Sequence, residues 1–353
     1  MSHPMKPTPN REKLAIKGGA PPAPQWPSFR GKSEFVGSSA SGRLNVFVDP
    51  ALGADGLQNA QDLVKDGDRV ANSNDAIFGT TGGAVSVIVF ALGGRTDGTG
   101  GADHMGCDYT TGNAIEVCAS FGNSARVTAL FEAELSECSM GGNLCGVSTG
   151  EALSRWCAEV TSNNALSDFA TAPAWAQDGM PDFVNKTAPT DQDANSTGCG
   201  MAFISWLMSQ GVSLSSIAQA LVSLGETGTF AQLYANLTSN PVSNAWPAFQ
   251  AAVKRLPNGV TNDDPFGAAA QSAQLAYIPP LTAPLAGRVF ASILTDIAAA
   301  KEPHQIVASV QAIMAAAHTA NIAQAAAVGG PSKSRRLLPP DKTPPGETKV
   351  KGA

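Results

Sequence analysis

Short apolar runs bounded by glycine or proline characterise the N-terminal third of the chain. Leu44–Val48 alternates apolar and polar positions, and Ala84–Leu92 is almost continuously apolar between two glycine pairs. Ala114–Cys118 is a shorter run of the same kind. Alternation with period two is typical of half-buried strands, and unbroken apolar runs of this length are typical of buried strands. We therefore predict three strands, with a helix at Gly56–Lys65 after the first.

The remainder of the chain follows the helical period. We predict helices near residues 125–139, 149–161, 198–210, 213–223, 228–237 and 243–254. Two Ala-rich helices, at about 284–300 and 304–327, meet at Pro303 and carry apolar stripes, which favours a helical hairpin. The predicted fold class is α+β: a small N-terminal sheet packs on the helix at 125–139, and a mostly helical lobe and the hairpin follow.

The charge is distributed unevenly along the chain. The net charge is −6, but residues 1–33 carry +5 and residues 331–353 carry +4, which leaves −15 on the body between them. Basic, Pro-rich ends are typical of disordered tails. We predict a disordered leader at 1–33, an α+β body at 34–258, the hairpin at 259–330 and a disordered tail at 331–353. Nucleic-acid-binding proteins normally carry a basic face on the folded part, so no nucleic-acid partner is expected.

Several other classes are disfavoured by the sequence. No apolar run reaches membrane-spanning length without polar interruption, and the N-terminus lacks the apolar segment of a secretory signal. The glycine-rich stretch Gly93–Gly101 has neither Walker A nor dinucleotide-binding spacing, so we expect no nucleotide cofactor.

The six cysteines all lie between residues 107 and 199 and form no C-x-x-C pair. This distribution argues against a zinc knuckle and suits local disulfides, with six buried thiols in a reducing compartment as the alternative. Disulfides would indicate an extracytoplasmic location, although no signal peptide is seen. The simplest predicted pairing is Cys107–Cys118, Cys138–Cys145 and Cys157–Cys199.

The helix at 125–139 places carboxylates on its apolar side. Helical spacing puts Glu134 and Glu137 on the same side as Val127 and Leu130. An inward carboxylate is costly unless it is paired, protonated or bound to a cation. The pattern predicts a specific use for these two side chains.

The segment AELSE at residues 133–137, followed by a glycine-rich loop and a second helix, resembles the active-site helix of gluzincin-type zincin metallopeptidases, which reads His-Glu-x-x-His. The resemblance implies Glu134 as general base, Glu137 as second metal ligand and Glu151 on the next helix as downstream ligand. Ala133 replaces the first histidine and binds nothing. Three carboxylates without imidazole would favour Ca²⁺, Mg²⁺ or Mn²⁺ over zinc.

The alternative for these carboxylates is structural. Arg126, Arg155 or backbone donors would pair with them beneath a loop.

His104 is the second candidate. It follows a glycine-rich turn, near the point where a strand edge lines the substrate groove of zincins. It could supply the missing imidazole as a metal ligand, or act as a catalytic acid or base beside Glu134. The alternative is a loop histidine hydrogen-bonded to Asp103 or Asp108.

A third segment contains oxygen-bearing side chains at the spacing of an EF-hand loop. Asp191, Asp193 and Asn195 match the first three positions, but the required glycine and the final glutamate are missing. We expect capping by Ser196 or Thr197 of the helix at 198–210 instead.

Residues 84–210 are also similar to a group of uncharacterised bacterial proteins that share the blocks ADHMGCDY, ELSE and GEALSR. The resemblances imply a zincin-like protein without the classical zinc motif. It would be either a degenerate peptidase that binds a peptide or protein partner, or a hydrolase with a carboxylate-rich site and a divalent cation. The alternative is a non-enzymatic assembly protein that forms a homo-oligomer through the C-terminal hairpin.

Overall fold

The structure is a computed structural model that describes residues 20–162, 165–190 and 192–269. The chain divides into two units, Met1–Tyr277 and Ile278–Ala353, and every described residue belongs to the first unit. The described part is α+β, as predicted. The predicted hairpin helices and the basic tail lie outside the described residues.

Five strands of the described part form one mixed sheet in the order β1-β2-β3-β5-β4. Their bounds are β1 (Glu34–Ser38), β2 (Leu44–Val48), β3 (Val85–Phe90), β4 (Ala102–His104) and β5 (Ala114–Cys118). The central strands β2, β3 and β5 are parallel, and the edge strands β1 and β4 are antiparallel to their neighbours. The three central strands are the predicted ones. β4 has only three residues, and β1, although as long as β2 and β5, is less apolar, so the hydrophobic pattern does not indicate the edge strands.

Eight α-helices lie within the described residues. Their bounds are α1 (Gly53–Phe78), α2 (Ser124–Ser139), α3 (Ser148–Ser162), α4 (Ala172–Gln177), α5 (Ala194–Ser209), α6 (Leu214–Leu224), α7 (Phe230–Thr238) and α8 (Ala245–Val253). Helix α1 extends well past the predicted end at Lys65. Its C-terminal half looks polar in sequence, but Val70, Ala71, Ile77 and Phe78 continue the buried stripe.

The two faces of the sheet are covered by different parts of the chain. Alternate residues of the parallel strands, such as Val46, Val87 and Val117, share a buried cluster with α1 and α2. Residues of the opposite parity, such as Phe47 and Ile88, form a separate cluster on the second face. The register therefore fixes which side chains of each strand face α2.

Residues 20–33 cover the second face of the sheet, which differs from the predicted disordered leader. Trp26 is buried and makes an edge-on ring contact with Phe47, and Phe29 makes a similar contact with Phe90. The buried carboxylate of Glu116 on β5 accepts hydrogen bonds from the Ser28 and Phe29 backbone N–H groups at 2.9 and 2.6 Å. These apolar and polar contacts fix the segment, which we call the N-terminal strap. Residues 1–19 of the predicted leader lie outside the described residues.

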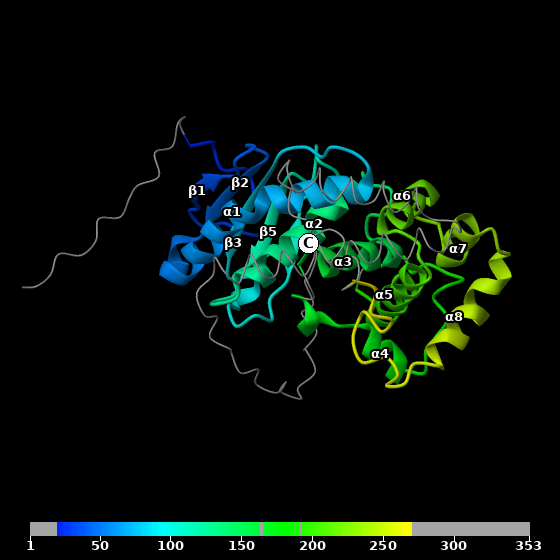
Figure 1. Cartoon of the computed structure of the whole chain (residues 1–353). Helices are drawn as coiled ribbons and strands as arrows, with labels where there is room; N and C mark the ends of the chain where they lie inside the picture. Colours follow the sequence, from blue (N-terminus) through cyan, green and yellow to red (C-terminus); the bar gives the residue numbers. More distant parts are fainter. Residues whose placement is uncertain (1–19, 163–164, 191, 270–353) are drawn as a thin grey trace, which may run out of the picture. The chain divides into compact units, whose positions relative to one another are not determined.

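The helical lobe has its own core. Trp156 of α3, Trp175 of α4 and Phe203 of α5 are fully buried in one cluster with residues of α6, α7 and α8. Helix α3 also contributes Ala158 to the cluster beneath the sheet. Figure 1 shows α2 and α3 between the strands and the later helices, and both helices contact each other along their lengths. This pair joins the two cores and carries most of the predicted site residues.

Candidate functional site

The register of β4 directs His104 toward α2. His104 pairs with Ile115 and Asp103 pairs with Glu116 in the antiparallel β4–β5 ladder. Ile115 belongs to the cluster that packs on α2, and Glu116 faces the N-terminal strap. Because successive side chains of a strand point to opposite faces, His104 lies on the α2 side of the sheet and Asp103 on the strap side.

Helix α2 presents two carboxylates to this edge of the sheet. Asn123 caps the helix, because its side chain accepts a hydrogen bond from the Arg126 backbone N–H. Glu134 and Glu137 lie one turn apart near the C-terminal end, and α2 contacts β4 directly. Their side chains are 14% and 22% exposed, and that of His104 is 11% exposed. The predicted inward orientation of the two carboxylates is confirmed.

The imidazole lies between the two carboxylates. His104 Nε2 is 2.8 Å from Glu137 Oε2 and 3.8 Å from Glu134 Oε2. One ligand atom from each of the three residues lies within 4.8 Å of the other two. We call this group the His-Glu-Glu cluster. It brings together both predicted catalytic residues, Glu134 and His104, and two of the three predicted metal ligands, His104 and Glu137.

The cluster favours the protonated form of His104. Burial disfavours the imidazolium, but the hydrogen bond and charge of Glu137, with the charge of Asp103, outweigh it and raise the pKa of His104 above its ordinary value. When His104 is protonated and no cation competes for the same oxygen atoms, it forms an ion pair with Glu137. The predicted alternative partners Asp103 and Asp108 do not share a described hydrogen bond with the ring.

Glu151 does not join the cluster, which corrects its predicted role as the downstream ligand. Arg155, one turn along α3, donates from Nε to Glu151 Oε1 at 2.5 Å. Arg155 also donates to the Phe169 backbone carbonyl at 3.1 Å. The carboxylates of Glu151 and Glu137 are among the causes that raise the pKa of Arg155 against its burial. The structural alternative thus holds for Glu151, and Arg155 supplies positive charge close to Glu137.

The other predicted arginine has a different partner. The buried guanidinium of Arg126 pairs with Asp168, with Nη2 2.8 Å from Oδ2. Its carbon Cζ lies 4.9 Å from the centre of the Phe169 ring. Arg126 therefore anchors the segment after α3 and does not pair with the carboxylates of the cluster.

Helix α2 also contains a buried acid that the sequence analysis missed. Glu132 is completely buried, and burial raises its pKa well above the ordinary value, more than Arg69 and Thr161 lower it. Burial therefore favours the neutral carboxylic acid form of Glu132. Its burial is caused by α3, which covers the side of α2 that also contains Ser136. Only the position of α3 distinguishes Glu132 from an exposed glutamate, so the sequence carries no local signal for it.

The cysteines form a pair that differs from the prediction. Cys107 and Cys145 are disulfide-bonded, with their Cα atoms 5.8 Å apart, and the other four cysteines are buried free thiols. Adjacent positions in sequence suggested the wrong partners, because the β4–β5 loop folds over the end of α2. Cys138 lies nearest the cluster in sequence, and burial with the charges of Glu134 and Glu137 raises its pKa to about 12. It remains a thiol and offers neither a nucleophile nor a metal ligand.

The predicted EF-hand-like segment has a capping role. Asp193, not Ser196 or Thr197, is the N-cap of α5, because its side chain accepts hydrogen bonds from the backbone N–H groups of Asn195 and Ser196. Helix α5 therefore begins earlier than predicted. Asp191 lies outside the described residues.

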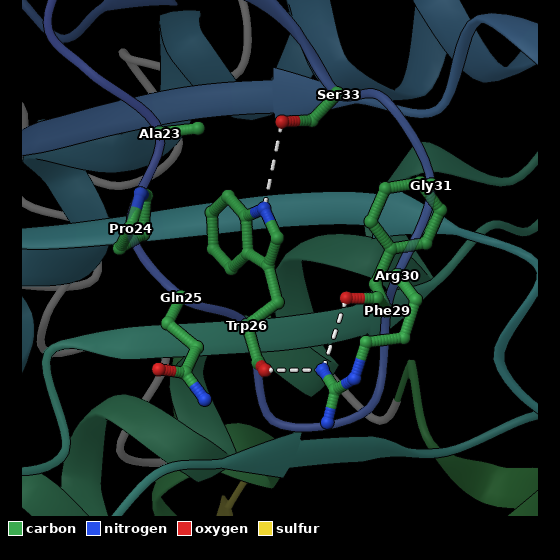
Figure 2. A pocket seen from close by; sticks show the side chains of 8 residues that line it. All are labelled: Ala23, Pro24, Gln25, Trp26, Phe29, Arg30, Gly31 and Ser33. Atoms are coloured by element: carbon green, nitrogen blue, oxygen red, sulfur yellow. Dashed lines mark hydrogen bonds between the residues drawn. The ribbon is translucent and has the colours of Figure 1, made fainter.

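Two hollows lie away from the cluster. One of about 340 Å³ lies within the N-terminal strap, where Trp26, Phe29 and Arg30 line it (Figure 2). Another of about 420 Å³ lies between the ends of α1 and α2 and helix α6, lined by neutral side chains such as Ser139 and Gln219. Neither lining contains an acid, a histidine or a cysteine. The titratable chemistry is therefore concentrated at the His-Glu-Glu cluster and not in these hollows.

The donor set fits a divalent cation. An imidazole nitrogen and two carboxylate oxygens converge from an edge strand and a helix, and their separations allow all three to contact one ion. The imidazole suits zinc and the two carboxylates suit manganese, so the mixed donor set is compatible with either ion. The ring is held through Nε2 by Glu137, and an interaction with the Gly106 backbone also favours its protonated form.

The comparisons leave the family open. No helix in the described residues is long and apolar enough to cross a membrane. Comparison with family models, curated proteins and solved structures found no match for this chain.

Proposed function

We propose that this protein is a zincin-like hydrolase in which His104, Glu134 and Glu137 hold and use a divalent cation. The observation that carries the proposal is the convergence of three ligand atoms within 4.8 Å at the junction of β4 and α2. The site would differ from the zincin pattern in one respect: the edge strand, and not the helix, contributes the imidazole. The imidazole of His104 on the edge strand would take the place of the histidine that the helix lacks at position 133, where this chain has alanine.

We assign separate roles to the two carboxylates. Glu137, 2.8 Å from His104 Nε2, is the ligand partner of the imidazole. Glu134 lies 3.8 Å from the same nitrogen and is positioned to accept a proton from a water molecule beside the ion. A bound divalent cation would lower the pKa of that water and polarise a substrate carbonyl.

The edge position of β4 supports a peptide as substrate. Within the described residues β4 pairs with β5 on one side only, so its other side can pair with an extended chain. A peptide bound there would run past His104 and toward both glutamates. The same geometry would serve a peptide-binding module if the hydrolytic step has been lost.

Metal analysis tests the proposal directly. The full-length protein, purified without chelator or nickel resin, is analysed for bound metal and then titrated with Zn²⁺ and Mn²⁺ after treatment with EDTA. Glu137→Gln and His104→Ala should each lower the affinity by about 100-fold or more, because loss of an outer partner of a ligand alone costs about 10- to 100-fold. Glu226→Gln, an exposed acid of the α6–α7 loop, is the matched control and should leave the affinity unchanged.

A third variant separates the two roles. Glu134→Gln should retain the cation and lose hydrolysis of a fluorogenic peptide library if Glu134 is the base. Loss of both would make Glu134 a ligand. A wild-type protein that binds neither metal more tightly than Glu137→Gln does would overturn the proposal. The C-terminal hairpin, on which the alternative assembly function depends, lies outside the described residues, and no described feature favours that function.

A further inference from the structure

We propose that the Cys107–Cys145 disulfide is a positioning element of the His-Glu-Glu cluster, and that its reduction releases His104 from Glu137. The disulfide joins the loop after β4 to the loop after α2, so it connects the two elements that supply the cluster. Cys107 follows His104 by three residues, and Cys145 follows Glu137 by eight. The effect on cation affinity rests on the proposed function, whereas the effect on the mobility of the two loops does not.

The loop between His104 and β5 is compact enough to transmit a constraint. Asp108 Oδ1 accepts hydrogen bonds from the backbone N–H groups of Thr110 and Thr111 at 2.7 and 2.6 Å. Gly112 N–H donates to the Asp108 carbonyl, and Gly106 has a φ of +78°. A Cβ at Gly106 would lie 2.4 Å from Thr111 Oγ1, so the turn closes on itself. A displacement of Cys107 would therefore carry His104 with it.

The opposite end of the disulfide is also fixed. Leu144, next to Cys145, is buried, and a Cβ at Gly150 in the first turn of α3 would meet the Leu144 carbonyl at 2.2 Å. The residues that follow α2 form turns, and the first of them, Met140, donates its N–H to the Ser136 carbonyl of the helix. The loop after α2 is thus clamped between α2 and α3, and Cys145 is a stable anchor for Cys107.

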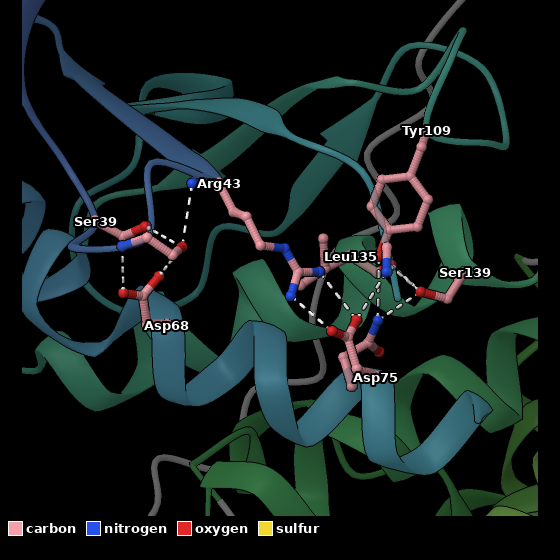
Figure 3. Close-up of polar contacts among 10 residues, drawn as sticks. Ser39, Arg43, Asp68, Asp75, Tyr109, Leu135 and Ser139 are labelled. Carbon is pink, nitrogen blue, oxygen red and sulfur yellow. Dashed lines mark hydrogen bonds and ion pairs between the residues drawn. The ribbon is translucent and has the colours of Figure 1, made fainter. Parts of the chain in front are cut away.

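Two other direct links join the loop after β4 to α2. The Cys138 thiol of α2 donates to the Gly112 carbonyl of the loop at 3.2 Å. Tyr109 Oη and Ser139 Oγ lie 2.8 Å apart, and Asn74 Nδ2 donates to both oxygens (Figure 3). Both neutral contacts lie beyond Cys107 along the loop from His104. They should hold the loop near α2 after reduction, but neither involves the residues between His104, the last residue of β4, and Cys107.

A reducing agent can break this disulfide selectively, because it is the one disulfide among the described residues. Dithiothreitol breaks the S–S bond, both sulfurs become thiols, and the reagent is oxidised to its cyclic disulfide. The other four cysteines are already free thiols, and all four are buried. Cys145 is exposed at the surface. The double variant Cys107→Ser/Cys145→Ser is the genetic equivalent of reduction and should not respond to the reagent.

Two measurements on the full-length protein test the inference. Hydrogen exchange followed by mass spectrometry should show about tenfold or faster exchange in residues 102–112 and 140–147 after reduction. The N-terminal strap and α8 should be unchanged, which makes them internal controls. In the same samples, the affinity for Mn²⁺ should fall by about 10- to 100-fold, the range expected for loss of an element that orients a ligand.

The outcomes separate the two proposals. Faster exchange in protein that binds neither Mn²⁺ nor Zn²⁺ in either state would support the positioning role and contradict the proposed function. Mn²⁺ binding that is equal in oxidised, reduced and doubly substituted protein would overturn the positioning role and leave the proposed function intact. The inference requires that the disulfide forms. It would be overturned if peptide mapping without reductant found Cys107 and Cys145 as free thiols.

Discussion

At the residue scale, Glu159 of α3 links pH to stability. Burial, with the charges of Asp263 and Asp264, raises the pKa of Glu159 to about 7 from an ordinary 4.5. The folded state therefore holds a proton that the unfolded state releases between about pH 4.5 and 7. Stability falls as pH rises through this window, by about 3 kcal/mol for a shift of this size.

Glu159→Gln should remove this dependence. The free energy of unfolding, measured with urea at pH 5 and pH 8, should fall between the two pH values by about 3 kcal/mol more in the wild type than in the variant. Taking this difference cancels titrating groups that the two proteins share. Glu226→Gln serves as the control, since that side chain is exposed. An equal change in wild type and Glu159→Gln would show that Glu159 titrates normally.

Residue patterns predicted part of the candidate site. Glu134 and Glu137 followed from helical spacing alone, because both lie on the stripe that also contains Leu130. The role of His104 depended on strand register, and β4 was too short for its register to be predicted. Glu151 was assigned wrongly because the motif carried over a ligand position, whereas the i, i+4 spacing to Arg155 already allowed the ion pair that forms.

At the element scale, the N-terminal strap replaces a layer of helices on the second face of the sheet. It contains charged residues and prolines and has no helical or strand period, so composition alone suggested disorder. The sequence signals that were available are the aromatic residues Trp26 and Phe29, which match the aromatic residues on one face of the strands. Two isolated aromatic residues define no helical or strand period, so they do not predict that the segment is ordered.

Trp26→Ala tests whether the strap is an integral layer. Trp26 is 4% exposed, so its truncation should lower the free energy of unfolding by about 3 to 5 kcal/mol. Urea titration followed by far-UV circular dichroism measures this change. Phe121→Ala, a truncation of an aromatic side chain that is 41% exposed, is the matched control and should cost less than about 1 kcal/mol. Equal stability of wild type and Trp26→Ala would mean that the strap contributes little to folding.

At the scale of the whole described part, α2 and α3 make two cores depend on each other. The sheet and the helical lobe each have a buried cluster, and α3 contributes Ala158 to one and Trp156 to the other. Local patterns predicted most elements of both cores. They contained no information on how the cores join, because this contact depends on pairing between helices that sequence periodicity treats separately.

Because α2 and α3 connect the two cores, we expect the sheet and the helical lobe to unfold together as one cooperative unit. Helix α2 packs on the sheet and on α3, and α3 packs on α5. Unfolding of the sheet would therefore remove support from α3 and, through it, from α5, so neither half should unfold alone under native conditions. Hydrogen exchange at increasing sub-denaturing urea measures this. The most protected amides of β3 and of α5 should report opening free energies within about 1 kcal/mol of each other, with the same dependence on urea. A difference of more than about 2 kcal/mol would contradict the prediction. In that case the His-Glu-Glu cluster would belong to a sheet unit with its own stability. Cation affinity would then be unchanged at a urea concentration that unfolds the helical lobe but not the sheet.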